Sequence, residues 1–277
     1  MLFRKKPKPQ QRYGLPAGRR IYAIGDIHGR FDLLEEMLAL IASDDGTRAA
    51  TETSIIFLGD LVDRGPQSSE VVHLVRALCQ GGAAMLVKGN HEELFVNAAR
   101  GDRNAARAFL SVGGDATLRS YGIADDTIHA GSFADLAVLM AKRIPREDVD
   151  FLDSGTSCIQ IGDYLFAHAG IEPGVDLADQ QDHEMRWIRE RFTRSERDHG
   201  VRVIHGHSLS ENVEVCRNRI GIDTGAYASG RLSALGMEGE DIWFLEANGS
   251  ATRDFARTAN PRADNLRASG LSDSSAR

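Results

Sequence analysis

Three stretches of the chain share one pattern, in which a short apolar run ends in a polar turn bounded by glycine. The apolar runs cover residues 21–24, 54–58 and 83–87, and apolar residues at helical spacing follow the first two over residues 31–41 and 69–78. Short apolar runs predict buried strands, and the spacing of three to four residues predicts helices packed on one face. Strand-turn-helix units in series predict a largely parallel α/β core with its site at the carboxyl ends of the strands.

The middle of the chain has a different pattern, with helical segments separated by glycines and little polar chemistry that repeats. We therefore expect a helical insertion beside the site, at about residues 95–153. Both chain ends are expected to be flexible, as a basic tail over residues 1–18 and a polar tail without periodicity over residues 248–277. One domain over residues 19–247 would then carry the function.

Further strands are expected after the insertion. Residues 157–161 and 164–167 predict a hairpin that turns at Gly162 and Asp163, and residues 201–204 predict another short buried strand. Four more apolar stretches predict a second, antiparallel set of strands, at residues 213–215, 219–222, 232–235 and 242–245.

Composition narrows the class of protein. With 42% hydrophobic and 26% charged residues in 277, the chain resembles an ordinary soluble protein. Its formal net charge of -7 argues against a nucleic-acid or membrane-surface partner, because either would favour a basic surface. No apolar run of signal-peptide length follows the basic start, so we expect a cytoplasmic location. The three cysteines are isolated, which predicts reduced thiols rather than disulfides or a zinc knuckle.

The first two polar turns contain metal-ligand chemistry. The first reads Gly-Asp-Ile-His-Gly, with Asp26 and His28 two positions apart, and the second reads Gly-Asp-Leu-Val-Asp-Arg-Gly, with Asp60, Asp63 and Arg64. A carboxylate with an imidazole suits a borderline divalent metal such as Mn, Fe or Zn, and one carboxylate can bridge two ions. Alone, the first pattern is more often a turn aspartate beside a surface histidine.

Three later turns add to the pattern. The third strand ends in Gly-Asn-His-Glu, where the Asn90 amide can ligate a metal without adding charge and His91 can handle a proton. His168 and His207 each follow another predicted strand directly. Turn-forming or core roles explain any one cluster. Five polar clusters at five strand ends, converging on one edge, favour a metal site instead.

Taken in order, these motifs resemble the phosphoprotein-phosphatase family of metallophosphoesterases over roughly residues 20–245. The similarity is greatest to the bacterial and bacteriophage serine/threonine phosphatases, because Trp-Ile-Arg-Glu-Arg at 187–191 follows His168 and Ile-Asp-Thr-Gly-Ala at 222–226 follows His207. The resemblance implies an α/β fold, in which a central β-sandwich of mixed sheets is flanked by helices and carries a helical insertion.

The resemblance also implies two divalent metal ions, with Mn expected and Fe or Zn as alternatives. Carried over by motif, Asp60 would bridge the two ions, and the remaining ligands would be Asp26 and His28 for the first ion and Asn90, His168 and His207 for the second. Two ions about 3.5–4 Å apart suit an in-line phosphoryl displacement. The expected nucleophile is a water or hydroxide held between them.

The remaining roles concern phosphate and proton. By the same resemblance, Arg64 and Arg189 would clamp the phosphate oxygens, a task suited to a planar, always charged guanidinium. His91 would protonate the leaving oxygen, and Asp63 would orient its ring. His205, two positions before His207, is expected to pack or to support a ligand rather than to bind a metal.

The expected activity is hydrolysis of a phosphomonoester in a phosphoprotein or phosphopeptide, as in a serine/threonine protein phosphatase. A symmetrical dinucleoside tetraphosphate hydrolase of the same superfamily is the alternative. Its motifs usually read Gly-Asn-His-Asp and lack the second aspartate, whereas this chain has Glu92 and Asp63. A catalytically idle phosphopeptide-binding module is a third reading, disfavoured because every expected ligand is present. The oligomeric state is left open.

Overall fold

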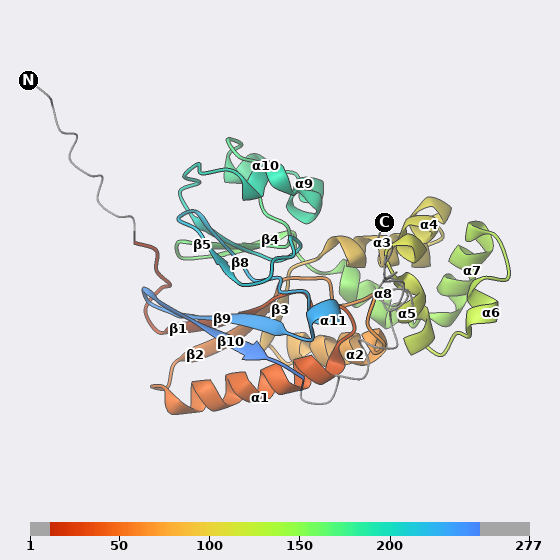
Figure 1. Ribbon diagram of the computed structural model, residues 1–277, viewed down its shortest axis with the longest axis horizontal. Coiled ribbons are helices and arrows are strands. Elements are labelled where there is room, and N and C mark those ends of the chain that lie inside the picture. The colour runs from red at the N-terminus through yellow and green to blue at the C-terminus, as the bar shows by residue number, and fades with distance from the viewer. Residues whose placement is uncertain (1–11, 250–277) are drawn as a thin grey trace, which may run out of the picture.

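The first of two stacked five-stranded sheets contains the three strands expected from the start of the chain (Figure 1). A computed structural model describes residues 12–249. The sheet has the order β10-β9-β1-β2-β3, in which β1, β2 and β3 are parallel and β9 and β10 are antiparallel to their neighbours. Its strands are β1 (Arg19–Ile24), β2 (Glu52–Phe57), β3 (Ala84–Leu86), β9 (Leu232–Glu238) and β10 (Asp241–Ala247).

The second sheet is also mixed, with the order β4-β5-β6-β8-β7. The expected hairpin is confirmed as the antiparallel pair β4 and β5, while β5, β6 and β8 run parallel. Its strands are β4 (Cys158–Ile161), β5 (Tyr164–Ala167), β6 (Arg202–His205), β7 (Glu214–Val215) and β8 (Arg219–Gly221). The expectation of an α/β fold built on a sandwich of mixed sheets is therefore confirmed.

The expectation of one separate antiparallel set after residue 213 is wrong. Strands β9 and β10 join the first sheet beside β1, whereas β7 and β8 extend the second sheet. All four stretches are strands, so the pattern located the elements. Side-chain alternation fixes which face of a strand is buried, but it does not name the neighbouring strand.

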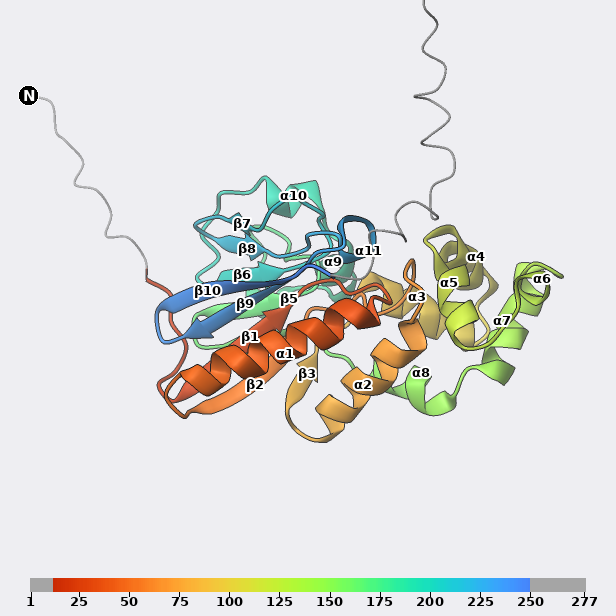
Figure 2. The same ribbon diagram turned by 60° about the horizontal axis from the view of Figure 1, so that its bottom comes forward.

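Helices cover both outer faces of the sandwich, and the side chains of each strand alternate between two cores. Ile21 and Ala23 of β1 belong to the core between the sheets, whereas Tyr22 and Ile24 belong to the core on the other face. Helices α1 and α2 cover that face (Figure 2). The helices before the insertion are α1 (Phe31–Thr47), α2 (Ser68–Gln80) and α3 (Asn90–Ala99). The second sheet is covered by α9 (Asp182–Trp187) and α10 (Glu190–Thr193), preceded by a 3-10 turn at Leu177–Asp179, and α11 (Ala226–Ser229) follows β8.

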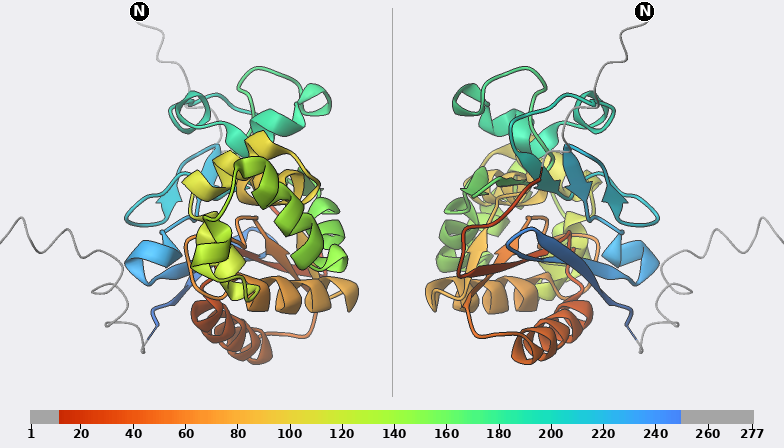
Figure 3. Two further views of the ribbon diagram at one scale, coloured as in Figure 1. Left: turned by 90° about the vertical axis from the view of Figure 1, so that its right-hand side faces the viewer. Right: turned by 90° about the vertical axis from the view of Figure 1, so that its left-hand side faces the viewer.

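Short helices fill the segment that we expected to be a helical insertion, and they gather at one end of the two sheets (Figure 3). They are α4 (Arg103–Ser111), α5 (Gly114–Ser120), α6 (Asp125–Ile128), α7 (Phe133–Arg143) and α8 (Arg146–Asp153). Phe95 of α3 and Phe109 of α4 pack edge to face, with ring centroids 5.7 Å apart. This contact ties the insertion to the helix that follows β3.

The two expected tails lie mostly outside the described residues. Residues 12–18 belong to the first of them, yet Tyr13 and Leu15 are buried in the core between the sheets, and the Leu15 amide donates to the Gly239 carbonyl at 2.8 Å. The three cysteines are free and half-buried. A helix with the length and apolar character needed to cross a bilayer does not occur within residues 12–249.

We expect Phe109→Ala to lower the free energy of unfolding by about 3–5 kcal/mol, because removing a fully buried aromatic ring leaves a cavity under α3. Urea denaturation measures the change. Phe133→Ala is the matched control, since that ring lies on α7 and is 44% exposed, and we expect a change within about 0.5 kcal/mol. Equal losses in both variants would show that the Phe95–Phe109 contact does not anchor the insertion.

Candidate dinuclear metal site

Backbone hydrogen bonds draw the polar turns together at one end of the strands. The amides of Ile27 and His28, in the turn after β1, both donate to the Asp60 carbonyl after β2, at 3.1 and 2.8 Å. The Gly206 amide, after β6, donates to the His168 carbonyl, after β5, at 2.8 Å. The convergence expected from parallel strands is therefore built into the main chain.

Left-handed backbone at non-glycine residues within residues 12–249 is confined to these turns. The non-glycine residues with a positive φ there are His28, Asp60, Asp63, Arg64 and His207, with φ between 48° and 74°. The left-handed region costs a residue with a Cβ about 1–3 kcal/mol, and such outliers cluster at active sites. Each of the five had been singled out for a metal, phosphate or proton role.

Two buried groups of potential ligands share the Asp60 carboxylate. The first consists of His28, Asp60 and His91, and the second of Asp60, His168 and His207, with the ligand atoms of each group within 4.8 Å of one another. Asp60 Oδ2 lies 3.6 Å from His28 Nε2 and 3.8 Å from His91 Nε2, whereas Asp60 Oδ1 lies 3.4 Å from His168 Nε2. Asp60 thus presents one oxygen to each group, as a bridging ligand requires.

Carbonyl groups orient two of the imidazoles. His28 Nδ1 lies 2.8 Å from the Val62 carbonyl, and His168 Nδ1 lies 2.7 Å from the Leu58 carbonyl. A carbonyl oxygen only accepts, so each Nδ1 carries the proton and leaves the Nε2 lone pair facing Asp60. The Asn90 amide oxygen lies 3.0 Å from His168 Nε2, which places it beside the second group.

Asp26 and His207 are joined by the main chain. The His207 amide donates to both Asp26 oxygens, at 3.0 and 3.2 Å, and a Cβ on Gly206 would overlap with Asp26 Oδ1. Asp26 is therefore at the site edge, although it belongs to neither of the two ligand groups above. His207 Nε2 is buried without a hydrogen-bond partner among the described residues.

The electrostatics of the buried groups suit cations. Burial would raise the pKa of Asp60, but His168, His91, His28 and His207 hold it below its ordinary value. Burial lowers the pKa of His28, and burial together with His168 lowers that of His207 to about 3, so both rings are neutral and could donate a lone pair to a metal ion. Burial and then Asp223 raise the pKa of Asp26, since these carboxylates lie close together. Two divalent ions would satisfy this donor set and relieve the carboxylate repulsion.

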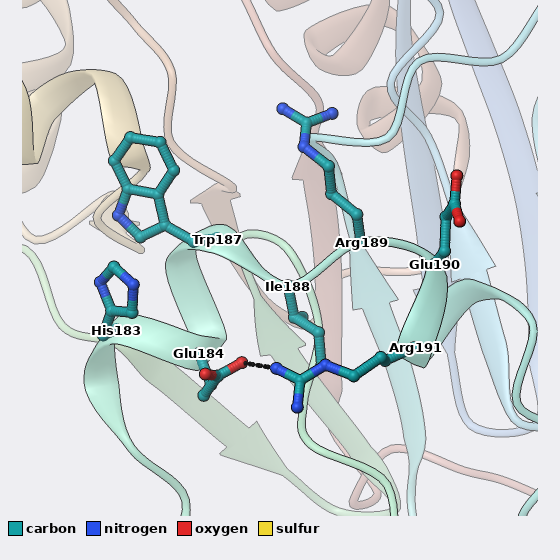
Figure 4. Close-up of a pocket in the computed structure, with 7 residues that line it drawn as sticks. All are labelled: His183, Glu184, Trp187, Ile188, Arg189, Glu190 and Arg191. Carbon is teal, nitrogen blue, oxygen red and sulfur yellow. Dashed lines mark hydrogen bonds and ion pairs between the residues drawn. The ribbon is translucent and has the colours of Figure 1, made fainter. Parts of the chain in front are cut away.

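The two expected phosphate-binding arginines have different neighbours. Arg64 is exposed, with Nη1 at 2.9 Å from His28 Nε2 and Nη2 at 3.1 Å from His91 Nε2, and its guanidinium stacks over Tyr227 at 4.5 Å. Arg189 follows α9, and its charge contributes to the lowered pKa of His207. Figure 4 shows Trp187 and Arg189 on the same side of their segment, with Ile188 pointing the other way.

The expected proton-transfer pair is in contact. His91 Nδ1 lies 2.6 Å from Asp63 Oδ2, and both side chains are buried. Burial favours the neutral His91 ring, yet the carboxylates of Asp60 and Asp63 raise its pKa overall. Thr117 of α5 donates to Asp63 Oδ1 at 2.7 Å and accepts from the Asp63 amide at 2.8 Å. The insertion therefore holds the residue that orients His91.

Sequence reasoning assigned no contacts to Glu92. Its carboxylate is fully buried and accepts three backbone amides, from Asp60 and Leu61 at 2.7 Å and from Gly89 at 2.9 Å. Glu92 thus fastens the turn after β2 to the turn after β3. The signal was its position three residues after the glycine that caps α3, where a glutamate reaches back to the cap.

The histidine that was expected to pack or to support a ligand belongs to neither of the ligand groups above. His205 is buried, and its ring packs edge to face on Phe192 at 5.2 Å, so it packs beside the site as expected.

Comparison with known proteins agrees with this geometry. The calcineurin-like phosphoesterase family matches residues 19–230. An asymmetrical bis(5'-nucleosyl)-tetraphosphatase PrpE of Anoxybacillus flavithermus is 25% identical over 76% of this chain and 88% of its own. Serine/threonine-protein phosphatase 2 of Escherichia coli is 29% identical over 78% of this chain and 91% of its own.

Similarity of fold extends further. A serine/threonine phosphatase structure from Saccharomyces cerevisiae superposes with a TM-score of 0.57, at 15% identity, over 86% of this chain and 82% of its own. The relatives divide between phosphatases and tetraphosphatases, while fold, family and buried ligand groups agree. The chain belongs to the calcineurin-like phosphoesterase family, as a metal-dependent phosphoesterase of the phosphoprotein-phosphatase type.

Proposed function

We propose that this enzyme is a serine/threonine protein phosphatase, which hydrolyses phosphoserine or phosphothreonine in a phosphoprotein or phosphopeptide. The observation that carries the proposal is the contact of 2.6 Å between His91 and Asp63, with His91 Nε2 facing the shared Asp60 carboxylate. A serine or threonine alkoxide is a poor leaving group, so its departure needs a positioned acid. A nucleotide phosphate leaves as a stable anion and needs that acid less.

The proposed metal ligands are Asp26, His28, Asp60, Asn90, His168 and His207, with Asp60 shared. Two divalent ions, for which Mn is our choice, would supply Lewis-acid activation of water and neutralise the charge that develops on the phosphate. The chain holds the carboxylates and neutral imidazoles ready for them, through the carbonyls that fix His28 and His168. The Asp26 carboxylate is held in place by the His207 amide.

The remaining groups bind phosphate and transfer the proton. Arg64 and Arg189 would approach the phosphate oxygens from opposite ligand groups, because one contacts His28 and the other acts on His207. His91 Nε2 would donate its proton to the leaving oxygen, while Nδ1 keeps its bond to Asp63. Thr117 prevents Asp63 from turning away.

Dinucleoside tetraphosphate hydrolysis is the second candidate, because tetraphosphatases are among the similar chains. Rates on a phosphoserine peptide, a phosphotyrosine peptide and a dinucleoside tetraphosphate test the choice. We expect kcat/KM to be highest on the phosphoserine peptide and lowest on the tetraphosphate. The reverse order would establish the second candidate. Binding of the phosphopeptide without hydrolysis of any substrate would establish an idle binding module instead.

We expect activity to disappear on chelation and to return when Mn is added to the dialysed protein. The proposed ligands are oxygens and imidazole nitrogens, with no thiolate to retain Zn against a chelator. Anomalous scattering from Mn-soaked crystals should locate two ions that share Asp60. A protein that stays fully active after measured removal of all metal would contradict the dinuclear site.

We expect His91→Asn to slow hydrolysis of alkyl phosphates by about 10²–10⁴-fold, since the leaving alkoxide loses its acid. Aryl phosphates should slow less, because a phenoxide leaves without much protonation. The ratio of the alkyl to the aryl rate, measured together with the metal content, distinguishes a proton donor from a metal ligand or a binding group. Asp63→Asn should shift this ratio in the same direction. Loss of a metal, or equal slowing of both substrates, would assign His91 to the ligands or to binding.

A further inference from the structure

Arg189 is held by its backbone rather than by its own side chain. It lies at the break between α9 and α10, with φ of -128° and ψ of -112°, and it is exposed. Within residues 12–249 its guanidinium makes no hydrogen bond or ion pair with another side chain. A flexible arginine clamps a phosphate well only when its Cα is placed accurately, so the neighbouring residues decide its position.

One neighbour, Trp187, is hydrogen-bonded to α3, the helix that begins with Asn90 and His91 at the candidate metal site (below, the metal edge). Trp187 Nε1 donates to Glu93 Oε2 at 3.0 Å, and Arg186 Nη1 lies 3.6 Å from the same oxygen. Glu93 belongs to α3, two positions after His91. The carboxylate therefore joins two consecutive residues of α9 to the helix that presents Asn90 and His91.

The contacts of Glu93 differ from the other contacts that hold α9 and Arg189 in place. Ile188 is 3% exposed and packs on the outer face of the second sheet, and the Ala169 amide donates to the Met185 carbonyl at 2.8 Å. Both anchors attach α9 to the sheet that carries His168. Glu93 alone among these contacts attaches the segment to α3. It therefore sets the distance between the Arg189 side of the site and the His91 side.

A pocket of about 400 Å³ opens along this segment, lined by Trp187, Ile188 and Arg189 among others (Figure 4). His183 stacks on Trp187, with ring centroids 5.9 Å apart and an angle of 27° between the rings. The indole is thus fixed on its face by His183 and at its nitrogen by Glu93. A ring held at two points transmits a shift of α3 to the next residues of the chain.

We propose that Glu93 is a positioning residue: through Trp187 it holds Arg189 at the distance from the metal edge at which the guanidinium binds the substrate phosphate. The inference rests on the proposed phosphate role of Arg189. It adds a residue to which the motifs give no function, and it explains why Trp187 stands two positions before the arginine.

The experiment measures KM, kcat and competitive inhibition by inorganic phosphate for Glu93→Ala, Glu93→Gln and Trp187→Phe. Glu93→Ala should raise KM and the phosphate inhibition constant about tenfold, since small misplacements of a binding group are costly. Glu93→Gln should recover most of this loss, because an amide oxygen still accepts from the indole. Trp187→Phe keeps a ring and removes the donor, so it should resemble Glu93→Ala.

A double-mutant cycle with Arg189→Ala separates positioning from general damage. Arg189→Ala alone should raise KM and the phosphate inhibition constant and slow turnover. Adding Glu93→Ala to it should change KM less than twofold, because the group that Glu93 positions is already gone. Metal content and the ratio of alkyl to aryl rates should remain those of the parent enzyme. Glu172→Gln is the matched control, since that carboxylate pairs with Arg191 of α10 at 2.8 Å and not with Trp187.

Several outcomes would overturn the inference. Additive effects of Glu93→Ala and Arg189→Ala would show that Glu93 acts elsewhere, as would an equal rise of KM in Glu172→Gln. If Glu93→Ala does not fold, unchanged KM in Trp187→Phe would be sufficient to reject it. An Arg189→Ala variant with unchanged kinetics would remove the proposed phosphate role itself. Failure of the inference alone leaves Arg189→Ala impaired and Trp187→Phe normal.

Discussion

The Asp60 carboxylate has to stay ionised while it is buried, and the arrangement of the site follows from that constraint. A buried carboxylate loses its hydration, so it keeps its charge only where other groups replace the water. Three imidazoles lie 3.4–3.8 Å from its oxygens, and the His91 amide donates to Oδ1 at 3.1 Å. Divalent metal ions would complete this set, because burial keeps the rings of His28, His168 and His207 neutral.

Main-chain geometry meets the same constraint. The φ of Asp60 is 51°, and its carbonyl accepts hydrogen bonds from the amides of Ile27 and His28. A Cβ at Gly89 would overlap with the Asp60 carboxylate, so the residue before Asn90 needs the space that glycine leaves. Glu92 then accepts the amides of Asp60, Leu61 and Gly89. Its pKa is raised to about 7, first by burial and then by Asp60, so the ionised form of Glu92 is also destabilised by its surroundings.

Much of the fold and of the candidate site could be predicted from the sequence, for a physical reason. Parallel strands bring their carboxyl ends to one edge, so local motifs after β1, β2 and β3 specify a shared place without long-range information. The pairing of β9 with β1 could not be predicted, because the register and neighbour of an amphipathic strand depend on the whole sheet. The hydrogen bond between Thr117 and Asp63 could not be predicted either. The two residues lie 54 positions apart, and nothing in the sequence around a helical threonine indicates that contact.

The helix α3 contacts several parts of the site that lie far apart in the sequence. Its first turn presents Asn90 and His91 to the buried carboxylate, Glu92 holds the loops after β2 and β3 together, and Glu93 reaches the segment that carries Arg189. Successive side chains on a helix point about 100° apart, so four consecutive residues face four directions. One helical turn can therefore contact the Asp60 carboxylate, the Asp63 carboxylate, the loops after β2 and β3, and α9 together. A displacement of this turn would disturb the proposed metal ligands, the proposed proton donor and the proposed phosphate-binding arginine at once, and the buried Glu92 carboxylate opposes such a displacement by accepting three backbone amides.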